Sequence, residues 1–432
     1  MTVRLTTELA VMLKQFEISQ ELERCSRCGS CMAVCPVYRE TGEEGMVARG
    51  KLSLIEANQR GELHQSRKFQ ELMEACLLCS GCVHQCANSV RVDKIIQWQR
   101  SRLRRDGKAG WTASLAASTL EAVGKWPMLV SQAGSLAQAL FCKKIPAESG
   151  LQLRFSLAVL SQRRYVPKLS ASPFLAQLPV NRLGSGPRVG LFVGCVGNYI
   201  ATEVSEATVE LLRRGGFQVV IPAEQRCCGM AAWASGDVAT ASILAQHNSE
   251  VFLKSGCQWI VSACGTCTTQ LSVRMPELLE QTAPNEARFL SQKSMDLMAF
   301  LTRQLGPEKL GQMVKSPGSL KLSYHDPCHL RYHQGIFREP RQLLSLLSEI
   351  HVAELSDTQQ CCGHGGLFNV SNYRLSNQIN ARRMAQVEKV GPEVLATGCM
   401  GCLLQLQEGN WRHGLGLTVC HLAEVLMGRV AR

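Results

Sequence analysis

The second half of the chain alternates short apolar runs with longer stretches that have the periodicity of amphipathic helices. The predicted strands are residues 188–193, 218–221, 259–261, 320–324 and 393–396. The predicted helices between them are residues 203–214, 237–254, about 340–348, and a long one after 372. Strands that alternate with helices predict parallel sheets covered by helices. The second half is therefore expected to be α/β.

This strand and helix order occurs twice, and a set of five cysteines accompanies each copy. The first set is Cys195, Cys227, Cys228, Cys264 and Cys267. The second set is Cys328, Cys361, Cys362, Cys399 and Cys402. Self-similarity at a nearly constant offset indicates a duplicated unit, so we predict domains at 187–316 and 317–432. The cysteines fall at strand ends and the turns that follow, where open α/β sheets place their ligands.

The first 108 residues contain two further cysteine runs of identical spacing, with a helix predicted at 48–57 between them. The runs are Cys25, Cys28, Cys31 and Cys35 followed by Pro36, and Cys76, Cys79, Cys82 and Cys86 followed by Ala87. Three thiolates from one tight loop bind three corners of a [4Fe-4S] cube, and in two-cluster ferredoxins the fourth cysteine serves the other cluster. We therefore assign Cys25, Cys28, Cys31 and Cys86 to one cluster, and Cys76, Cys79, Cys82 and Cys35 to the other. Structural zinc also uses C-x-x-C pairs, but it needs two pairs rather than three cysteines in register.

Residues 109–186 form a connector with Leu- and Ala-rich helical stretches. Residues 111–190 hold nine Lys or Arg and only Glu121 and Glu148 as acids, out of a net charge of +12 for the chain. An anionic membrane surface, an acidic partner and a solvated connector each account for this charge. The block lacks interleaved aromatic residues, so we predict no nucleic-acid partner. The uncharged stretch 126–142 contains Pro127 and Gly134 and falls short of the roughly 20 apolar residues of a membrane span.

Composition places the protein in a reducing compartment. The 432 residues include 21 Cys, grouped rather than scattered, and the chain opens without an apolar signal segment. Tight C-x-x-C spacings in such a long chain favour metal binding over disulfides. We expect a cytoplasmic protein, and if the connector binds lipid, the contact would be peripheral and at the inner face of the cell membrane.

Each five-cysteine unit resembles the cysteine-rich domain of the heterodisulfide reductase family, with its single Cys, its Cys-Cys-Gly turn and its final C-x-x-C. Gly229 and Gly363 follow the two cysteine pairs. The resemblance implies that each set of five thiolates holds a further iron-sulfur cluster. Zinc, or a thiol site without metal, remains the alternative for these units.

The whole arrangement resembles the iron-sulfur subunits of glycolate oxidase, D-lactate dehydrogenase and anaerobic glycerol-3-phosphate dehydrogenase. Residues 48–55, 324–335 and 401–405 carry this resemblance in addition to the cysteines. It implies an electron-transfer subunit of an oxidoreductase, with a separate FAD-containing dehydrogenase subunit as partner and membrane quinone as acceptor. A thiol-disulfide oxidoreductase of the heterodisulfide reductase type is the alternative.

No catalytic residue is predicted in this chain. A glycine-rich nucleotide motif after a strand is absent, since Gly184-Ser-Gly186 precedes its strand. His325, His329, His333 and His364 gather around the second unit and are interpreted as polar loop residues. Cys142, Cys257 and Cys420 belong to no motif and are interpreted as buried thiols. The predicted fold class is thus α+β multidomain, a helical ferredoxin-like two-cluster module followed by two α/β Cys-Cys-Gly domains.

Overall fold

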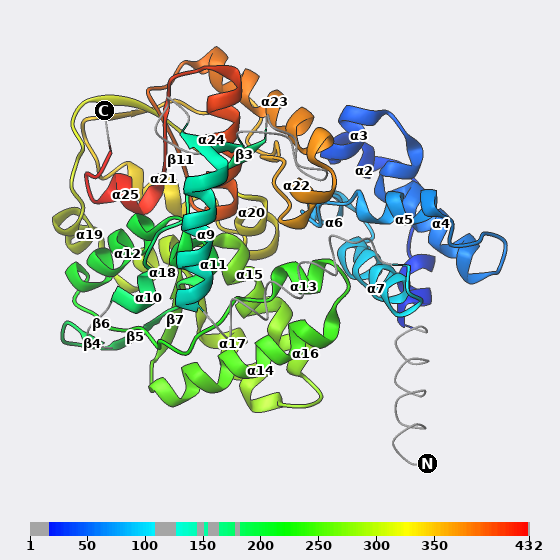
Figure 1. The fold of residues 1–432 in the computed structure, drawn as a ribbon, viewed down its shortest axis with the longest axis horizontal. Helices are drawn as coiled ribbons and strands as arrows, with labels where there is room; N and C mark the ends of the chain where they lie inside the picture. The colour runs from blue at the N-terminus through cyan, green and yellow to red at the C-terminus, as the bar shows by residue number, and fades with distance from the viewer. Residues whose placement is uncertain (1–16, 109–126, 145–150, 154–163, 178–181, 431–432) are drawn as a thin grey trace.

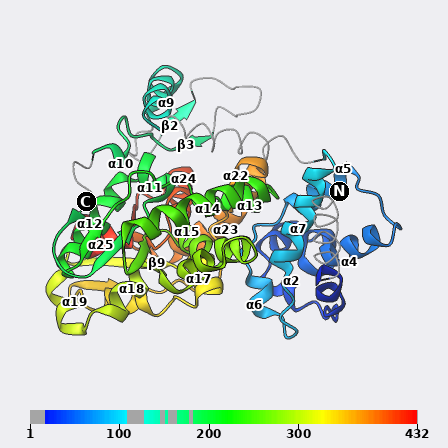
Figure 2. The same cartoon turned by 90° about the horizontal axis from the view of Figure 1, so that it is seen from below.

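The computed structural model describes residues 17–108, 127–144, 151–153, 164–177 and 182–430. It has a helical module at the N-terminal end and two α/β units, with the described part of the connector lying across the outside of the units (Figure 1). Figure 2 shows the N-terminal module beside the units, and helix α9 on the outer side of the units, away from the module. This is the fold class that the sequence predicts. The domain boundaries proposed after residues 108, 186 and 316 stay predictions.

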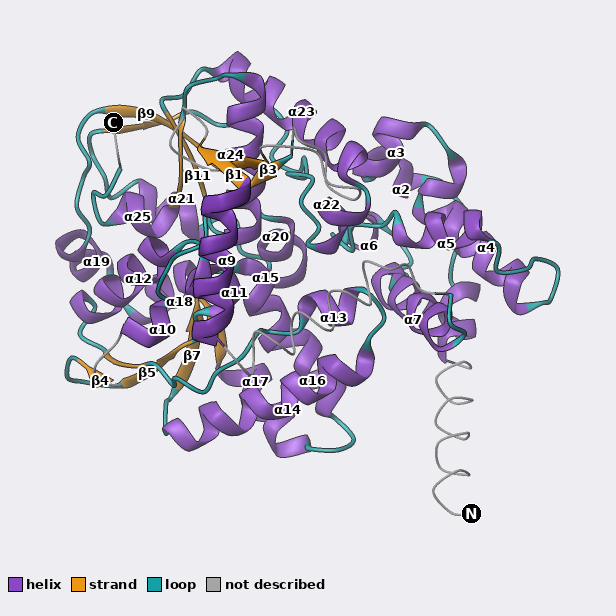
Figure 3. Cartoon of the chain, in the orientation of Figure 1, coloured by secondary structure: helices purple, strands orange, loops and turns teal. Residues whose placement is uncertain are grey.

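The N-terminal module is built from short helices joined by loops that carry the cysteines (Figure 3). It contains α2 (Ser30–Val34), α3 (Pro36–Thr41), the 3-10 turn η1 (Glu44–Met46), α4 (Ala48–Gln59), α5 (Arg67–Glu74), α6 (Gly81–Gln85) and α7 (Val92–Arg105). The core is formed mainly by α4, α5 and α7, whose apolar residues Ile55, Met73 and Ile95 are fully buried. The helix predicted between the two cysteine runs is α4.

The first α/β unit has a five-stranded sheet of order β4-β6-β5-β7-β8. Its strands are β4 (Arg182–Leu183), β5 (Arg188–Leu191), β6 (Gln218–Val220), β7 (Trp259–Ser262) and β8 (Ser294–Asp296), of which only β4 pairs antiparallel. The helices are α11 (Gly194–Tyr199), α12 (Thr202–Arg214), α13 (Met230–Ala234), α14 (Val238–Ser255), α15 (Gly265–Thr269), η2 (Gln270–Arg274), α16 (Met275–Leu279), α17 (Pro284–Lys293), α18 (Leu297–Gln304) and α19 (Pro307–Met313). Val189 and Ile260 on the central strands are fully buried, as expected where helices cover both faces.

The second unit repeats this arrangement with a four-stranded parallel sheet of order β10-β9-β11-β12. Its strands are β9 (Leu320–His325), β10 (Ile350–Val352), β11 (Val394–Thr397) and β12 (Thr418–His421). Its helices are α20 (Cys328–Gln334), α21 (Glu339–Leu344), α22 (Leu367–Ser371), α23 (Tyr373–Val390), α24 (Met400–His413) and α25 (Leu422–Leu426). Helix α21 is shorter than the helix predicted at 340–348, because Leu346 and Leu347 bond three residues back and tighten the turn.

The described part of the connector is not only helical, which corrects the sequence prediction. It contains α9 (Pro127–Phe141), α10 (Phe174–Gln177) and a small antiparallel sheet of order β1-β2-β3. The strands are β1 (Cys142–Lys144), β2 (Leu151–Leu153) and β3 (Tyr165–Val166), which are too short to show an alternating pattern. Among the described residues, no helix combines the length and the apolar character that crossing a bilayer requires.

Buried and half-buried ion pairs fix the N-terminal module against both units. Asp93 on α7 pairs with Arg274 of the first unit, and the two side chains are 2% and 1% exposed. On the other side, Arg39 of α3 lies 3.0 Å from Asp357 in the second unit. Arg382 on α23 lies 2.6 Å from Glu40. The N-terminal module is therefore held by ion pairs to both α/β units rather than to one alone.

Candidate metal centres

The two N-terminal cysteine loops have the same unusual backbone. In the first loop Arg27 and Gly29 have φ of 55° and 85°, and in the second Leu78 and Ser80 have φ of 53° and 61°. These residues follow the first cysteine of each run by two and four positions, so the loops match residue by residue. A non-glycine residue with positive φ costs of order 1–3 kcal/mol and persists only where the surroundings demand it. Two loops that share this conformation fit tight wrapping around a compact cofactor.

Four cysteines from both runs surround one small cavity. Cys35, Cys76, Cys79 and Cys82 line a space of about 30 Å³ inside the module. These are the four that the crossed assignment places on one cluster, so the structure brings them together from both loops. The ligand assignment itself stays a prediction.

Two buried cations lie beside this cavity. Lys51 is 2% exposed and donates to the carbonyl oxygen of Leu72, and burial lowers its pKa to about 8. Arg100 is also buried and donates to the backbone carbonyls of Met73, Glu74 and Cys76. Buried cations need nearby negative charge. The four cysteines supply it once iron binding has converted their thiols to thiolates. This charge arrangement fits an anionic iron-sulfur cluster.

The remaining N-terminal cysteines include the one exposed cysteine of the two runs. Cys25, Cys31 and Cys86 pack on the same buried cluster of side chains, while Cys28 is exposed. The Ser30 hydroxyl lies 3.3 Å from Cys28 Sγ and is the main cause of the lowered pKa of that thiol. The more solvent-exposed cluster is thus expected at Cys25, Cys28, Cys31 and Cys86.

The two five-cysteine sets meet in one cavity, which the spacing of the cysteines along the chain does not reveal. A cavity of about 190 Å³ is lined by all ten of these cysteines. Within the second set Cys362 Sγ and Cys402 Sγ are 3.2 Å apart. Between the sets Cys264 Sγ and Cys399 Sγ are 3.9 Å apart. Any metal centres held by the two sets would therefore be neighbours.

Close packing brings the two units to this distance. A Cβ atom on Gly265, next to Cys264, would lie 2.7 Å from the side chain of Leu330 in the second unit. A larger residue would force the two cysteine sets apart. Glycine at this position therefore allows the backbone of α15 to approach α20.

The second unit also contacts the N-terminal module at its cysteines. Cys79 and Cys361 belong to one buried cluster of side chains, together with Leu77 and Phe368. Helix α20, which begins at Cys328, packs on α6 of the module. The cysteine sets are thus contiguous, running from the module to the second unit and from there to the first.

Comparison with known proteins agrees with this architecture. The model of the 4Fe-4S dicluster domain matches residues 21–90, and that of the cysteine-rich domain matches residues 189–272 and 322–407. The probable glycolate oxidase iron-sulfur subunit of Bacillus subtilis is 28% identical over 98% of each chain. One subunit of the CoM/CoB fumarate reductase of Methanothermobacter marburgensis is 23% identical over 96% of this chain and 73% of the relative.

Similarity to a shorter relative shows the family to which this chain belongs. Lactate utilization protein A of Bacillus subtilis is 34% identical over 56% of this chain and over its own full length. This chain belongs to the same family as that relative, a family of iron-sulfur proteins with cysteine-rich domains. Together with the dicluster match, membership supports an iron-sulfur electron-transfer protein with two [4Fe-4S] clusters and further metal sites in the cysteine-rich domains. The glycolate oxidase relative from Bacillus subtilis and the fumarate reductase relative from Methanothermobacter marburgensis are subunits of oxidoreductases by their names.

Three of the four histidines of the second cysteine-rich domain are placed differently from the sequence prediction. His325 ends strand β9, and His329 and His333 lie on α20, so only His364 is in a loop. A helix that starts directly at Cys328 puts the two later histidines on regular backbone. His329 Nδ1 lies 3.0 Å from Thr266 Oγ1 of the first domain. Burial lowers the pKa of His325 to about 3.

The cysteines outside the five-residue sets and the ferredoxin runs are buried, as predicted. Cys142, Cys257 and Cys420 are each less than a tenth exposed. None of them lines the cavity that the ten cysteines share. They provide matched controls for substitutions of the proposed ligands.

Proposed function

We propose that this protein is the iron-sulfur electron-transfer subunit of a flavin-dependent 2-hydroxy-acid dehydrogenase acting on glycolate or D-lactate. The contiguous line of cysteine sets, from the exposed Cys28 to the cavity of the two cysteine-rich domains, carries this proposal. When bound, iron-sulfur clusters supply one-electron redox centres. The full-length likeness to a probable glycolate oxidase iron-sulfur subunit supports the substrate class.

The partner in this proposal is a separate FAD-containing subunit, and the final acceptor is a membrane quinone. Substrate oxidation removes two electrons as a pair, whereas clusters accept them singly, so a flavin on the partner would divide the pair. The iron-sulfur subunit of anaerobic glycerol-3-phosphate dehydrogenase stays an alternative assignment for the same architecture.

The chain alone should have clusters but no dehydrogenase activity. Protein purified without oxygen is expected to show the visible absorption of iron-sulfur clusters, and no reduction of a dye with glycolate or D-lactate. Activity should appear when the FAD-containing partner is added. Dye reduction by the isolated chain would contradict the division of labour proposed here.

We further propose that α9 rests on an anionic lipid surface. Its polar residues Ser131, Ser135 and Gln138 face inward and bond to backbone atoms of residues 167–170. Its outer face therefore carries Leu136 and Leu140, which are 62% and 59% exposed. The helix contains no charged residue, and the block around it carries nine Lys or Arg against two acids. Outward apolar side chains among basic flanks suit the interface of an anionic bilayer.

Vesicle binding tests this face. The protein is expected to co-sediment with phosphatidylglycerol vesicles and much less with pure phosphatidylcholine vesicles, because anionic lipid attracts the basic block. The double variant Leu136→Ser, Leu140→Ser should bind roughly tenfold or more weakly, since each buried Leu contributes about 1.5–3 kcal/mol. Ile243→Ser, at an exposed apolar residue of α14, is the control and should bind as wild type. Unchanged binding of the double variant would exclude α9 as the contact.

The shared cavity favours one other function, disulfide reduction. Ten thiols around one space of about 190 Å³ could accommodate a small disulfide as well as metal centres. Reduction would add two electrons and two protons to the disulfide and release two thiols. Assaying the reduced protein with mixed thiol disulfides separates this function from the first, which predicts no turnover.

A further inference from the structure

One histidine converges with two cysteines of the second unit. A ring nitrogen of His325 and the sulfur atoms of Cys362 and Cys402 all lie within 4.8 Å of one another, and all three side chains are buried. Among the described residues, these three form the one group of candidate ligands that is so compact. Thiolates of a cubane cluster are spread over four different irons, so they do not approach one point in this way. Donors of a single metal atom do.

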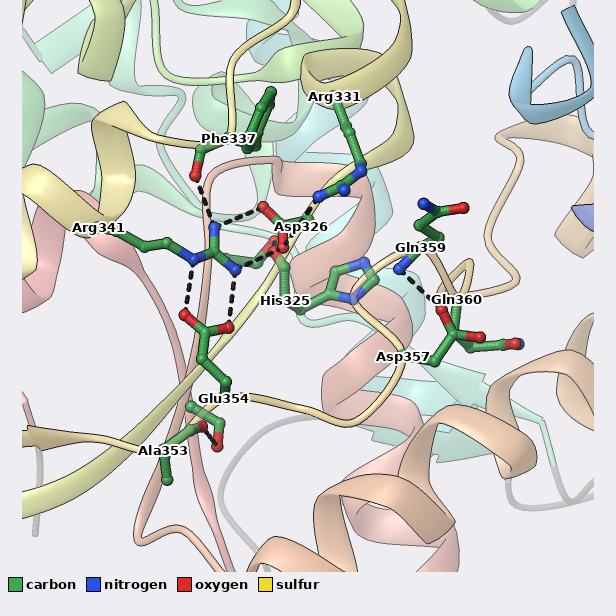
Figure 4. A network of polar contacts seen from close by, with 12 residues as sticks. His325, Asp326, Arg331, Phe337, Arg341, Ala353, Glu354, Asp357, Gln359 and Gln360 are labelled. Atoms are coloured by element: carbon green, nitrogen blue, oxygen red, sulfur yellow. Dashed lines mark hydrogen bonds and ion pairs between the residues drawn. The ribbon is translucent and has the colours of Figure 1, made fainter. Parts of the chain in front are cut away.

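The imidazole of His325 lacks any other partner among the described residues. It is 1% exposed, and neither Nδ1 nor Nε2 has a hydrogen-bond partner there. Figure 4 shows the ring beside Asp326 but turned away from the ion pair of Arg341 with Glu354. Asp326 itself is engaged by Arg341, at 2.8 and 2.9 Å. A buried polar ring without a partner is costly, so a ligand on the side of the two thiols is expected.

The first unit does not have this third donor. Phe192 precedes Cys195 by three residues, as His325 precedes Cys328, and Phe192 is packed on the ring of Phe252. The five cysteine positions, by contrast, are the same in both units. The two units therefore differ in donor chemistry at one equivalent position, despite identical thiol sets.

A neighbouring charge also favours metal binding in the second unit. Arg383 on α23 is fully buried and donates to the carbonyl oxygen of Gln360, directly before the cysteine pair. The equivalent residue on α14 is the neutral Asn248, which bonds the backbone at the same place. A buried guanidinium stabilises thiolates, and thiolates are the form that binds metal.

We propose that His325 is a metal ligand, and that it binds one metal atom of the second unit together with Cys362 and Cys402. Iron and zinc both bind imidazole and thiolate ligands. The proposed site is therefore a mixed nitrogen and sulfur site that suits either metal. This inference rests on the proposed metal centre of the second unit. It gives the two units different centres, with nitrogen coordination in the second and only sulfur in the first.

Nitrogen spectroscopy on the full chain tests this coordination. Protein grown with ¹⁵N-histidine and purified without oxygen is examined by pulsed EPR in its paramagnetic redox state, and by X-ray absorption at the zinc edge. If the atom is iron, a strong ¹⁵N coupling is expected, and His325→Phe should abolish it. If the atom is zinc, the edge spectrum should contain a light-atom ligand that the variant loses.

The controls separate ligation from packing. His325→Phe copies the residue of the first unit, and His364→Gln changes a histidine that lines the shared cavity outside the compact group. The His364 variant should keep the nitrogen signal of wild type. A metal-loaded second unit with only weak ¹⁵N coupling, or an unchanged signal in His325→Phe, would overturn the ligation while leaving the proposed function intact. A second unit without iron or zinc on elemental analysis would overturn both the centre and the ligation.

Discussion

Replacing Cys82 with Ser is expected to remove one [4Fe-4S] cluster, and with it about four iron and four sulfide per chain. Cys82 lines the small cavity together with Cys35, Cys76 and Cys79, and a serine oxygen is a poor ligand for this cluster. Because Cys79 of this set packs with Cys361 of the second unit, the variant should also lose electron transfer from the flavoprotein to quinone. Iron and sulfide analysis, EPR and quinone reduction measure the three effects.

The control for this substitution is Cys257→Ala, at a buried thiol outside every set. That variant should retain wild-type iron content and activity. Full cluster content in the Cys82 variant, or equal iron loss in the Cys257 variant, would show that Cys82 is not a specific ligand of this cluster. Anaerobic purification is essential because thiolate-bound iron is oxidised easily.

Replacing Arg274 with Met is expected to destabilise the protein by about 3–5 kcal/mol. Its guanidinium pairs with the buried Asp93 and lies 4.5 Å from the ring centre of Trp233. The variant leaves the Asp93 carboxylate with the half-exposed Arg91 as its remaining ion-pair partner among the described residues. An insufficiently compensated buried charge is the main cost. Urea unfolding, followed by tryptophan fluorescence, should show a lower midpoint.

The pH dependence of this effect has a definite sign. Burial alone would raise the pKa of Asp93, but the charge of Arg274 and hydrogen bonds from Arg91 hold it well below its usual range. A carboxyl with a depressed pKa stabilises the fold above its unfolded pKa of about 3.9 and loses that contribution as the pH falls. The difference between wild type and variant should therefore shrink below about pH 4.

An exposed ion pair provides the matched control. Arg67 and Glu71 on α5 are 91% and 53% exposed and lie 3.1 Å apart. Arg67→Met should change stability by less than about 0.5 kcal/mol, because water screens such a pair. Equal destabilisation by the two substitutions would mean that the contact between the module and the first unit contributes little.

Much of this architecture could be predicted because it depends on local patterns. Strands β5, β6, β7, β9 and β11 are apolar runs bounded by helices of clear period, and the cysteine runs have spacings that only tight loops satisfy. The connector sheet could not be found, since strands of two or three residues have no period. The meeting of Cys264 and Cys399 could not be found either, because residues 135 positions apart are joined only by packing of whole units.

His325 shows the same limit at a single residue. A histidine at the end of an apolar strand is compatible with a loop, a satisfied core residue or a ligand, and spacing alone does not separate these. The sequence does not show that His325 lies close to Cys362 and Cys402, because these residues meet only when β9 and α24 pack in the folded unit. The difference between His325 and Phe192 is readable in the sequence, but only after the two units have been aligned.

The contact between Cys264 and Cys399 reveals an internal symmetry of the chain. The two residues hold equivalent positions, and they touch each other; likewise α15 packs on α20 while their counterparts α24 and α11 also meet. Equivalent surfaces that meet in this reciprocal way are the mark of a two-fold axis, as in a symmetric homodimer. The two units of the chain are thus arranged like the two subunits of a symmetric dimer. Because the two copies stand in one chain, they need not be identical, and the position that is Phe192 in the first is His325 in the second.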